Sequence, residues 1–415
     1  MPTDATALPP LPFSEPPHLS SLPSPIFTPS HLRFRAAIQP FISENLNQHA
    51  LDWESSGHVP ESVFAKFASA NMLIPALPAP LPVEWLRRLG LGTLMGGVDV
   101  EEFDGLHGLV YGDEMARSGV LGPAASLTTG IAFGVPPIIK FGSRELQEQV
   151  LPDLLLGKKR ACLAITEPGA GSDVANITTT AELSQDGKSY IVNGTKKWIT
   201  NGLWADYATT AVRTGPPGPA GVSLLLIPLK DTPGITTQPI LTTPSSSGTS
   251  TSGTSLITIS SALVPATNLI GLPNHGLSYI LRNFTHERIS IAVGAVRQAR
   301  VALGEAMGYV MRREAFGQAL VEQPVVRHRL AKAGAMVESL GAWVEGLAWV
   351  AVRLQKQSQE NAATSKHIEI KLGGMAALAK AHAGIVLDEC ARCAVLLFGG
   401  NGLTREGQGE LVESN

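Results

Sequence analysis

One side chain that could do chemistry is Glu287, a glutamate beside the apolar surface of a predicted helix. On a helix, Ile280, Phe284 and Ile291 fall within about 40° of one another, at about 100° per residue. Glu287 lies about 20° outside that cluster, at its border with a polar arc. Such a carboxylate can turn to solvent or pair with an arginine, because a fully buried, unpaired glutamate is rare. It can also lie against an apolar pocket with a raised pKa and accept a proton, and both interpretations stay open here.

A glycine-rich stretch, AITEPGAGSDVAN at 164–176, could bind an anionic or carbonyl ligand. Gly169 and Gly171 let backbone N–H groups turn toward such a ligand, and Thr166 and Ser172 add hydroxyl groups. A single G-x-G is more often a surface turn between domains. This stretch therefore indicates a ligand-binding site only in combination with the other motifs of the chain.

A second stretch, NGTKKWITNG at 193–202, has the pattern of a strand. With a period of two, Trp198 and Thr200 would share one face of that strand. An indole beside a hydroxyl suits a flat heterocycle with polar edges.

Two later stretches could bind phosphate groups. In MRREAFGQ (311–318), Arg313 could bind a pyrophosphate close to Gly317, a residue type that often follows the end of a helix. The glycine run of LFGGNGL (397–403) would let the backbone pack closely on a ligand. None of these stretches matches a Walker loop or a strand-borne G-x-G-x-x-G, so phosphate binding would be of another kind.

The composition is that of a soluble globular protein. The chain has 415 residues, of which 44% are hydrophobic and 16% charged, and its net charge is −3. A chain of this length can form two or three domains. The charge excludes the basic surface of a nucleic-acid-binding protein, and the lack of a run of 18 apolar residues predicts no membrane span. We find no pattern of a signal peptide, a transit peptide or a peroxisomal tripeptide, and we expect an intracellular protein.

The three cysteines predict a reducing compartment without a disulfide framework. Cys390 and Cys393 form a C-x-x-C inside an apolar helical stretch, whereas a zinc site needs further ligands and a redox motif usually opens a helix. We therefore expect these two thiols to pack in a core, and we expect no metal site.

The texture of the sequence changes along the chain and predicts a multidomain α+β protein. Residues 1–30 hold eight prolines and predict a disordered or loosely draped arm, and residues 31–160 have the periodicity of helices. Residues 161–273 alternate short β-branched runs with Asp-Gly, Asn-Gly and Pro-Gly turns, which indicates antiparallel strands. A low-complexity loop at 243–255 interrupts them. Residues 274–415 return to a helical period.

Taken together and in this order, the motifs closely resemble the acyl-CoA dehydrogenase family. The similar stretches are DEMARSGV, GVPPIIKFGSRELQEQVLPDLLLGKKRACLAITEPGAGSDV, WITNG, VPATNLIG, HGLSYIL, ERISIA, RREAFGQALVEQP and FGGNGL. The resemblance runs from about residue 31 to the end of the chain. It implies an N-terminal α-helical domain, a middle antiparallel β-barrel-like domain and a C-terminal helical bundle. It also implies FAD, a homodimer or homotetramer, and an electron-transfer flavoprotein or oxygen as electron acceptor.

The resemblance also implies which residues bind the flavin. Those of the same subunit are Leu163, Ile165, Thr166, Ser172, Trp198, Ile199 and Thr200, and those that would reach a neighbouring subunit's flavin are Arg313, Phe316, Gln323, Gly399 and Gly400. Thr166 would lie near the pyrimidine edge of the flavin, and Thr200 near its N5. The family often has an aromatic residue at position 163 and a glutamine at position 324, where this chain has Leu163 and Pro324.

The substrate and the base follow from the same resemblance. Residues Ser172, Phe284, Thr285, Glu287 and Arg288 would line the acyl-CoA channel. In most relatives the base is a glutamate after the GGxG turn, but the chain ends thirteen residues after Gly402, so we expect that C-terminal segment to be lacking. Three later glutamates lie too near the turn to replace the base, namely Glu406, Glu410 and Glu413.

Glu287 precedes Arg288 in the way that the base does in a minority of relatives, including isovaleryl- and long-chain-type enzymes. This position favours α-proton abstraction by a carboxylate of raised pKa, with hydride transfer from Cβ to flavin N5, over the surface glutamate. The alternative is a catalytically silent protein that keeps the fold for subunit association, because a bundle without its last segment could bind FAD weakly.

Overall fold

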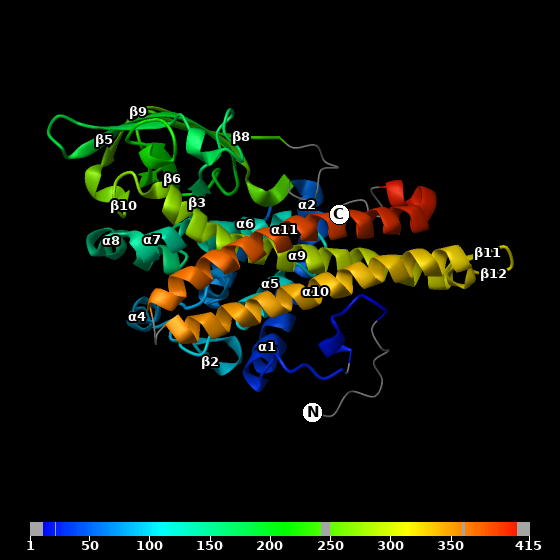
Figure 1. Ribbon diagram of the computed structural model, residues 1–415. Coiled ribbons are helices and arrows are strands. Elements are labelled where there is room, and N and C mark those ends of the chain that lie inside the picture. The colour runs from blue at the N-terminus through cyan, green and yellow to red at the C-terminus, as the bar shows by residue number, and fades with distance from the viewer. Residues whose placement is uncertain (1–10, 21, 242–249, 359–361, 405–415) are drawn as a thin grey trace. The chain divides into compact units, whose positions relative to one another are not determined.

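The structure is a computed structural model that describes residues 11–20, 22–241, 250–358 and 362–404 (Figure 1). The chain divides into two units. The first, called here the sheet unit, comprises Arg33–Tyr111 and Leu121–Glu287. The second, called the bundle unit, comprises Met1–Leu32, Gly112–Val120 and Arg288–Asn415. Three helices run from one unit into the other, namely α1 (Pro29–Asn45), α5 (Gly105–Met115) and α9 (Gly276–Arg312).

Short helices make up the first half of the sheet unit. They are α2 (Ala50–Ser56), α3 (Glu61–Ser69), α4 (Val83–Arg88), α6 (Gly122–Thr129), the π-helical segment η5 (Gly130–Gly134), α7 (Pro136–Phe141) and α8 (Arg144–Leu155), with a small ladder of β1 (Thr93–Leu94) and β2 (Val98–Asp99). Helix α8 shows how the sequence sets them. Ser143 accepts a hydrogen bond from Leu146 N (3.1 Å) as its N-cap, and buried apolar residues follow at helical spacing.

Eight strands of the sheet unit form one mainly antiparallel sheet, in which β3 and β4 pair parallel to β6. They are β3 (Ala161–Ala164), β4 (Thr180–Leu183), β5 (Ser189–Ile199), β6 (Tyr207–Arg213), β7 (Val222–Pro228), β8 (Ile235–Pro239), β9 (Ser255–Pro265) and β10 (Leu269–Ile270). The order is β10-β7-β6-β4-β5-β9-β8, and β3 also pairs with β6. Strands β6 and β7 are buried along almost their whole length, as central strands covered on both faces are.

Long helices build the bundle unit. Helices α10 (Pro324–Ser358) and α11 (Ala362–Phe398) lie side by side, and α9 is joined to α10 by a hairpin of β11 (Glu314–Ala315) and β12 (Gln318–Ala319) (Figure 1). Apolar residues such as Leu303, Val337 and Val386 are fully buried between them. The predicted fold class, helices followed by a β domain and a helical bundle, is thus confirmed. It arises because buried residues recur at helical spacing in the helices and at alternate positions in strands such as β5.

The C-x-x-C thiols lie on α11 and are both buried, in agreement with a packing role. The Sγ atom of Cys390 lies 3.8 Å from the carbonyl oxygen of Ala333 on α10. Burial raises the pKa of the Cys390 thiol to about 12, so this sulfur stays protonated and unreactive at neutral pH.

Residues 11–20 of the proline-rich stretch contact the bundle unit, of which they are part, whereas the first ten residues lie outside the described part. Glu15 lies 2.6 Å from Arg117 and 3.1 Å from Arg297, whose guanidinium also donates to Asp113 (2.6 Å). The carbonyl of Phe13 accepts a further bond from Arg300 (3.2 Å). These contacts supply acceptors to two arginines of α9, each 1% exposed, and composition alone does not show that need.

Glu15→Gln is expected to lower the free energy of unfolding by about 1–3 kcal/mol, since it leaves the buried Arg297 and the half-buried Arg117 short of a carboxylate. Burial alone would raise the pKa of Glu15, but Arg297 and Arg117 outweigh it and hold that pKa below the usual range. Denaturant unfolding of both proteins at neutral pH measures the loss. The control is Glu101→Gln, whose ion pair with Arg87 is exposed and should contribute no more than about 1 kcal/mol. Equal stability of wild type and Glu15→Gln would contradict this role.

Two apolar segments of the described residues are long enough to cross a membrane by length and composition. They are Gly122–Phe141, most of which is buried, and Pro324–Leu354. Core helices of soluble proteins pass the same test, so this observation is weak.

Candidate active site

The glycine-rich loop begins where β3 ends, at Ala164. Strand β3 runs parallel to β6, with Ala161 opposite Tyr207 and Ala164 opposite Thr210. The backbones of Glu167 and Ala170 then bond to each other in both directions (3.0 and 3.2 Å), which closes a tight turn. A Cβ atom added at Gly169 or Gly171 would meet nothing within 4 Å. These glycines therefore do not serve packing inside the chain, and the loop has open space in which a ligand could lie.

A buried ion pair fixes this loop, and the sequence analysis missed it. Lys196, which has no exposed surface, places its Nζ atom 2.8 Å from Glu167 Oε1 and 3.0 Å from the carbonyl oxygen of Ile165. The other carboxylate oxygen of Glu167 accepts from Thr178 N (2.6 Å). The alternation of the strand could have predicted that Lys196 is buried, because it lies at an even-numbered position of β5, like the buried Tyr190 and Val192.

The electrostatics of this pair hold both partners charged at neutral pH. Burial alone would raise the pKa of Glu167, but the Lys196 ammonium and the hydrogen bonds from Thr178 and Thr179 lower it to about 2. Burial lowers the pKa of Lys196 to about 8, against the opposing effect of Glu167. A charged pair with hydrogen bonds to the backbone on both sides holds the loop in one conformation.

Trp198 lies beside the loop on an irregular end of β5. The ladder to β9 shifts register between Lys196 and Ile199, and Trp198 adopts a φ of 64°, which is rare for a residue other than glycine. Its side chain is 53% exposed, and Lys197 N donates to the carbonyl oxygen of Thr166 (2.9 Å). An exposed indole on strained backbone, next to an open glycine loop, suits the stacking of a flat ring.

The expectation that Trp198 and Thr200 share a strand face is wrong, because β5 ends at Ile199 and its register shifts before that end. Other loop residues differ in exposure. Ile165 and Ile199 are buried, Leu163, Thr166 and Thr200 are half-buried, and Ser172 is exposed.

Glu287 lies near the start of α9 and bonds to a buried neighbour. Its Oε1 atom accepts from Asn283 Nδ2 (2.6 Å), one helical turn earlier, and the same nitrogen donates to the carbonyl oxygen of Phe133 (3.0 Å). Residues Phe284, Thr285, Glu287 and Arg288 are all half-buried. His286, between them, packs edge-on against Phe133, and burial together with Lys140 lowers its pKa to about 3, so its imidazole is neutral.

The π-helical segment η5 connects the glutamate to the strand that leads into the glycine-rich loop. A Cβ atom at Gly130 would come within 2.0 Å of the carbonyl oxygen of Ala161, and one at Gly134 within 2.8 Å of that of Cys162. Gly130 N also donates to the Asn201 side chain (2.8 Å), and Thr209 Oγ1 donates to the carbonyl oxygen of Gly134 (2.6 Å). Segment η5 is thus seated directly on β3 while its Phe133 carbonyl receives Asn283. Such π-helical turns often mark functional sites.

The remaining candidate residues belong to the bundle unit. Arg313 precedes the β11–β12 hairpin, and Phe316 lies in its turn, 95% exposed and with a φ of 55°. Gln323 lies just before α10, and Gly399 and Gly400 open the short helix η11 (Gly399–Leu403) after α11, where both are exposed. Position 324, where the family often has glutamine, is the first residue of α10.

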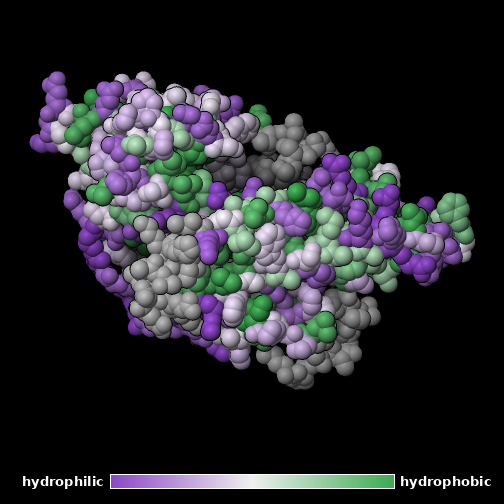
Figure 2. Space-filling model, in the orientation of Figure 1, coloured by the Kyte–Doolittle hydropathy of each residue, from purple (hydrophilic) through white to green (hydrophobic). Residues whose placement is uncertain are grey.

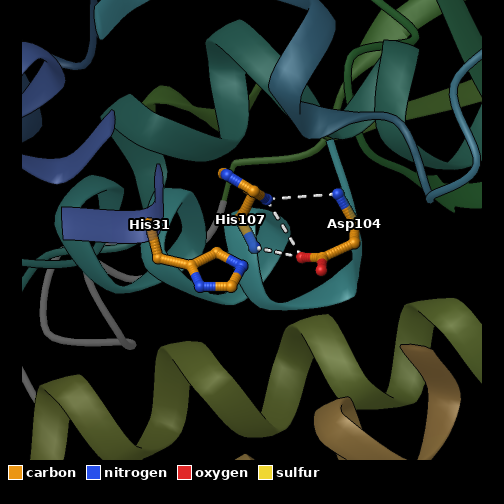
Figure 3. A group of neighbouring side chains, drawn as sticks. All are labelled: His31, Asp104 and His107. Carbon is orange, nitrogen blue, oxygen red and sulfur yellow. Dashed lines mark hydrogen bonds and ion pairs between the residues drawn. The ribbon is translucent and has the colours of Figure 1, made fainter. Parts of the chain in front are cut away.

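One further group of titratable residues in the sheet unit is structural. Asp104 Oδ1 accepts from Leu106 N (3.0 Å) and His107 N (3.2 Å) at the start of α5 and lies 3.0 Å from the His107 ring (Figure 3). The His107 ring stacks on Phe103, with centroids 5.4 Å apart, and is buried. A capping aspartate and a core histidine explain this arrangement.

Comparisons with known proteins show the family to which the chain belongs. The chain matches the family models for the acyl-CoA dehydrogenase N-terminal domain at residues 28–158, the middle domain at 162–258 and the C-terminal domain at 274–413. It is 58% identical over 404 residues to acyl-CoA dehydrogenase apdG of Emericella nidulans, covering 97% of this chain and 89% of that protein.

Solved structures show the same fold. A probable acyl-CoA dehydrogenase from Mycobacterium abscessus has a TM-score of 0.77 and 30% identity, with 93% of each chain covered. An acyl-CoA dehydrogenase from Bacillus anthracis, solved in complex with FAD, has a TM-score of 0.78 and 25% identity, covering 94% of this chain and 63% of that one.

The chain belongs to the acyl-CoA dehydrogenase family, and it is an FAD-dependent enzyme of acyl-CoA dehydrogenation. The residues present fit the cofactor, because an open glycine loop lies beside an exposed indole. The match of the C-terminal domain reaches residue 413, so the expectation that the chain lacks the family's C-terminal segment is wrong. Glu406, Glu410 and Glu413 lie outside the described residues.

Proposed function

We propose that this enzyme dehydrogenates an acyl-CoA thioester between Cα and Cβ, with Glu287 as the base that removes the α-proton. The main support is a pair of hydrogen bonds from Asn283, one to Glu287 and one to Phe133 in η5. Segment η5 packs against β3, the strand that leads into the glycine-rich loop. The proposed base and the proposed flavin loop therefore depend on one packed element of the sheet unit.

The residues of this chain would act mainly by holding groups in place. Glu287, half-buried near the start of α9, would accept the α-proton, which the thioester carbonyl acidifies. The neutral imidazole of His286 adds no second charge beside it. The Lys196–Glu167 pair would hold the loop of Thr166 and Ser172 in the conformation that receives the cofactor. Bound FAD supplies the acceptor for the hydride that leaves Cβ.

Substrate contacts follow the same placement. Ser172 on the exposed part of the glycine loop would meet the pantetheine arm, and Phe284, Thr285 and Arg288 would line the acyl channel. Activity with CoA thioesters, and none with the free acids, tests this assignment, and a panel of straight and branched thioesters would define the acyl group. The rate of flavin re-oxidation in air, compared with that in the presence of an electron-transfer flavoprotein, would identify the electron acceptor.

The enzyme is further proposed to work as a homodimer or homotetramer. Arg313, Phe316, Gln323, Gly399 and Gly400 would reach the flavin of a neighbouring subunit. Support comes from the Phe316 ring, which is 95% exposed, and from the exposed apolar residues of α11, namely Met375, Leu378, Ile385 and Leu396. Figure 2 shows hydrophobic side chains interspersed with hydrophilic ones on the long helices of this unit. We keep the division at 31–160, 161–273 and 274–415 as part of this proposal.

Arg313→Ala is expected to weaken FAD binding by about 1–3 kcal/mol, or roughly five- to 150-fold, because a charge-assisted bond to the pyrophosphate is lost. Flavin absorbance per chain after dilution and gel filtration measures the loss. Arg392→Ala is the control, since Arg392 is an exposed residue of α11 paired with Asp388 (2.9 Å). Full flavin occupancy in Arg313→Ala would rule out this contact.

The catalytically silent alternative depended on a missing C-terminal segment, and the match through residue 413 removes that ground. The purified enzyme should carry about one FAD per chain. Colourless protein that cannot be reconstituted with FAD would contradict the proposed function.

A further inference from the structure

The side chain of Asn283 occupies an unusual position for a polar residue near the start of a long helix. It is 4% exposed, and its Nδ2 atom donates both to the carbonyl oxygen of Phe133 (3.0 Å) and to Glu287 Oε1 (2.6 Å). An amide nitrogen carries two hydrogens, so both are used. Because both partners are acceptors, the opposite orientation of the amide would face oxygen toward oxygen. The amide orientation is therefore determined by its neighbours.

The element that receives Asn283 is itself fixed. Segment η5 is in contact with β3 at Gly130 and Gly134, where a side chain of any size would collide with strand carbonyls. Asn201 and Thr209 each add a hydrogen bond to it, of 2.8 and 2.6 Å. The Phe133 carbonyl therefore fixes the side chain of Asn283, and the second hydrogen bond of Asn283 restricts the Glu287 carboxylate one helical turn away.

We infer that Asn283 is a positioning residue that holds the Glu287 carboxylate in its proton-accepting orientation by joining it to η5. This inference depends on the proposed role of Glu287. A glutamate side chain has three rotatable bonds, and a base that must find its orientation at each turnover loses rate relative to one already oriented. The donor at i−4 bonds to the Oε1 atom and so restricts the rotation of the carboxylate.

A purely structural role is the competing explanation. A buried asparagine bonded to Phe133 could serve only to hold α9 on η5, and then Glu287 would be an incidental second acceptor. The two explanations differ in what happens when Glu287 can no longer act as a base. A positioning residue should then have nothing further to contribute to the rate, whereas a structural residue should matter equally in both backgrounds.

The test measures flavin reduction by an acyl-CoA under anaerobic conditions in FAD-loaded protein. Asn283→Leu nearly keeps the volume and removes both donors without adding a charge, and Asn283→Ser is a second, smaller variant that guards against a folding defect. We expect the limiting reduction rate to fall about ten-fold or more, while the substrate concentration at half-maximal rate changes less than about three-fold. Combined with Glu287→Gln, either variant should change the residual rate by less than about two-fold.

Asn268→Ser is the matched control. Asn268 is also a buried asparagine of the sheet unit, and it donates to the carbonyl oxygen of Leu226 (2.9 Å), but it belongs to no proposed site. Its reduction rate should stay within about two-fold of wild type. Wild-type rates in both Asn283 variants, or an equal slowing in the Glu287→Gln background, would overturn the inference alone. A wild-type rate in Glu287→Gln itself would overturn the proposed base and this inference with it.

Discussion

Glu287→Gln should reduce turnover with an acyl-CoA by about 10²–10⁴-fold, the range that general-base catalysis contributes. The amide keeps the volume of the carboxylate, and its oxygen can still accept from Asn283, so the start of α9 should stay intact. It cannot take a proton from Cα. Steady-state turnover with an artificial electron acceptor measures the loss, which should lie in the rate and not in substrate binding.

The control for this variant is Glu305→Gln, on the same helix α9 but exposed and within the bundle unit. It should retain wild-type turnover. Equal turnover in wild type and Glu287→Gln would return Glu287 to the ordinary surface glutamate of its helix.

Lys196→Met should destabilise the sheet unit by about 3–5 kcal/mol and empty the flavin site. The substitution leaves the Glu167 carboxylate buried without its ammonium partner, which is the costly way to break a buried pair. The loop of Thr166 and Ser172 then loses its anchor. Denaturant unfolding measures the first effect, and flavin absorbance per chain measures the second.

In the wild type, the contribution of this pair to the free energy of unfolding should depend on pH in the acid range. The folded-state pKa of Glu167 is about 2, below its ordinary value of 4.5, so its contribution to stability is present above about pH 4.5 and is lost as the pH falls toward 2. Lys196→Met should lack this contribution. In the double variant of Lys196→Met with Glu167→Gln, part of the stability should return, because no unpaired charge stays buried and the amide oxygen can still accept from Thr178 N. Lys188→Met, at an exposed position before β5, serves as the control. A Lys196→Met protein as stable as the wild type would contradict the role of the pair.

Much of the fold was predictable because it depends on patterns that are local in the sequence. Helix α8 could be placed from its capping serine and apolar spacing, and the sheet from alternating runs between turn residues. The glycine-rich loop, Trp198 and Glu287 could be proposed as site residues because their residue types are unusual at those positions.

The parts that could not be predicted depend on partners distant in sequence. Lys196 meets Glu167 across 29 positions, and Asn283 meets Phe133 across 150. The register shift at the end of β5 turns Trp198 outward, and a strict period of two cannot anticipate such a bulge. Likewise, Glu15 is bonded to Arg297, which lies 282 positions later in the sequence.

The most direct test of the whole account is a single anaerobic turnover of the FAD-loaded enzyme with an acyl-CoA, followed by the loss of flavin absorbance. The wild type should bleach completely on mixing. Glu287→Gln at the same FAD occupancy should bind the thioester, seen as a shift of the flavin spectrum, and bleach at least about 100-fold more slowly. Bleaching of both proteins at one rate, or of neither with any thioester of the panel, would contradict the assignment of Glu287 as the base of an acyl-CoA dehydrogenase.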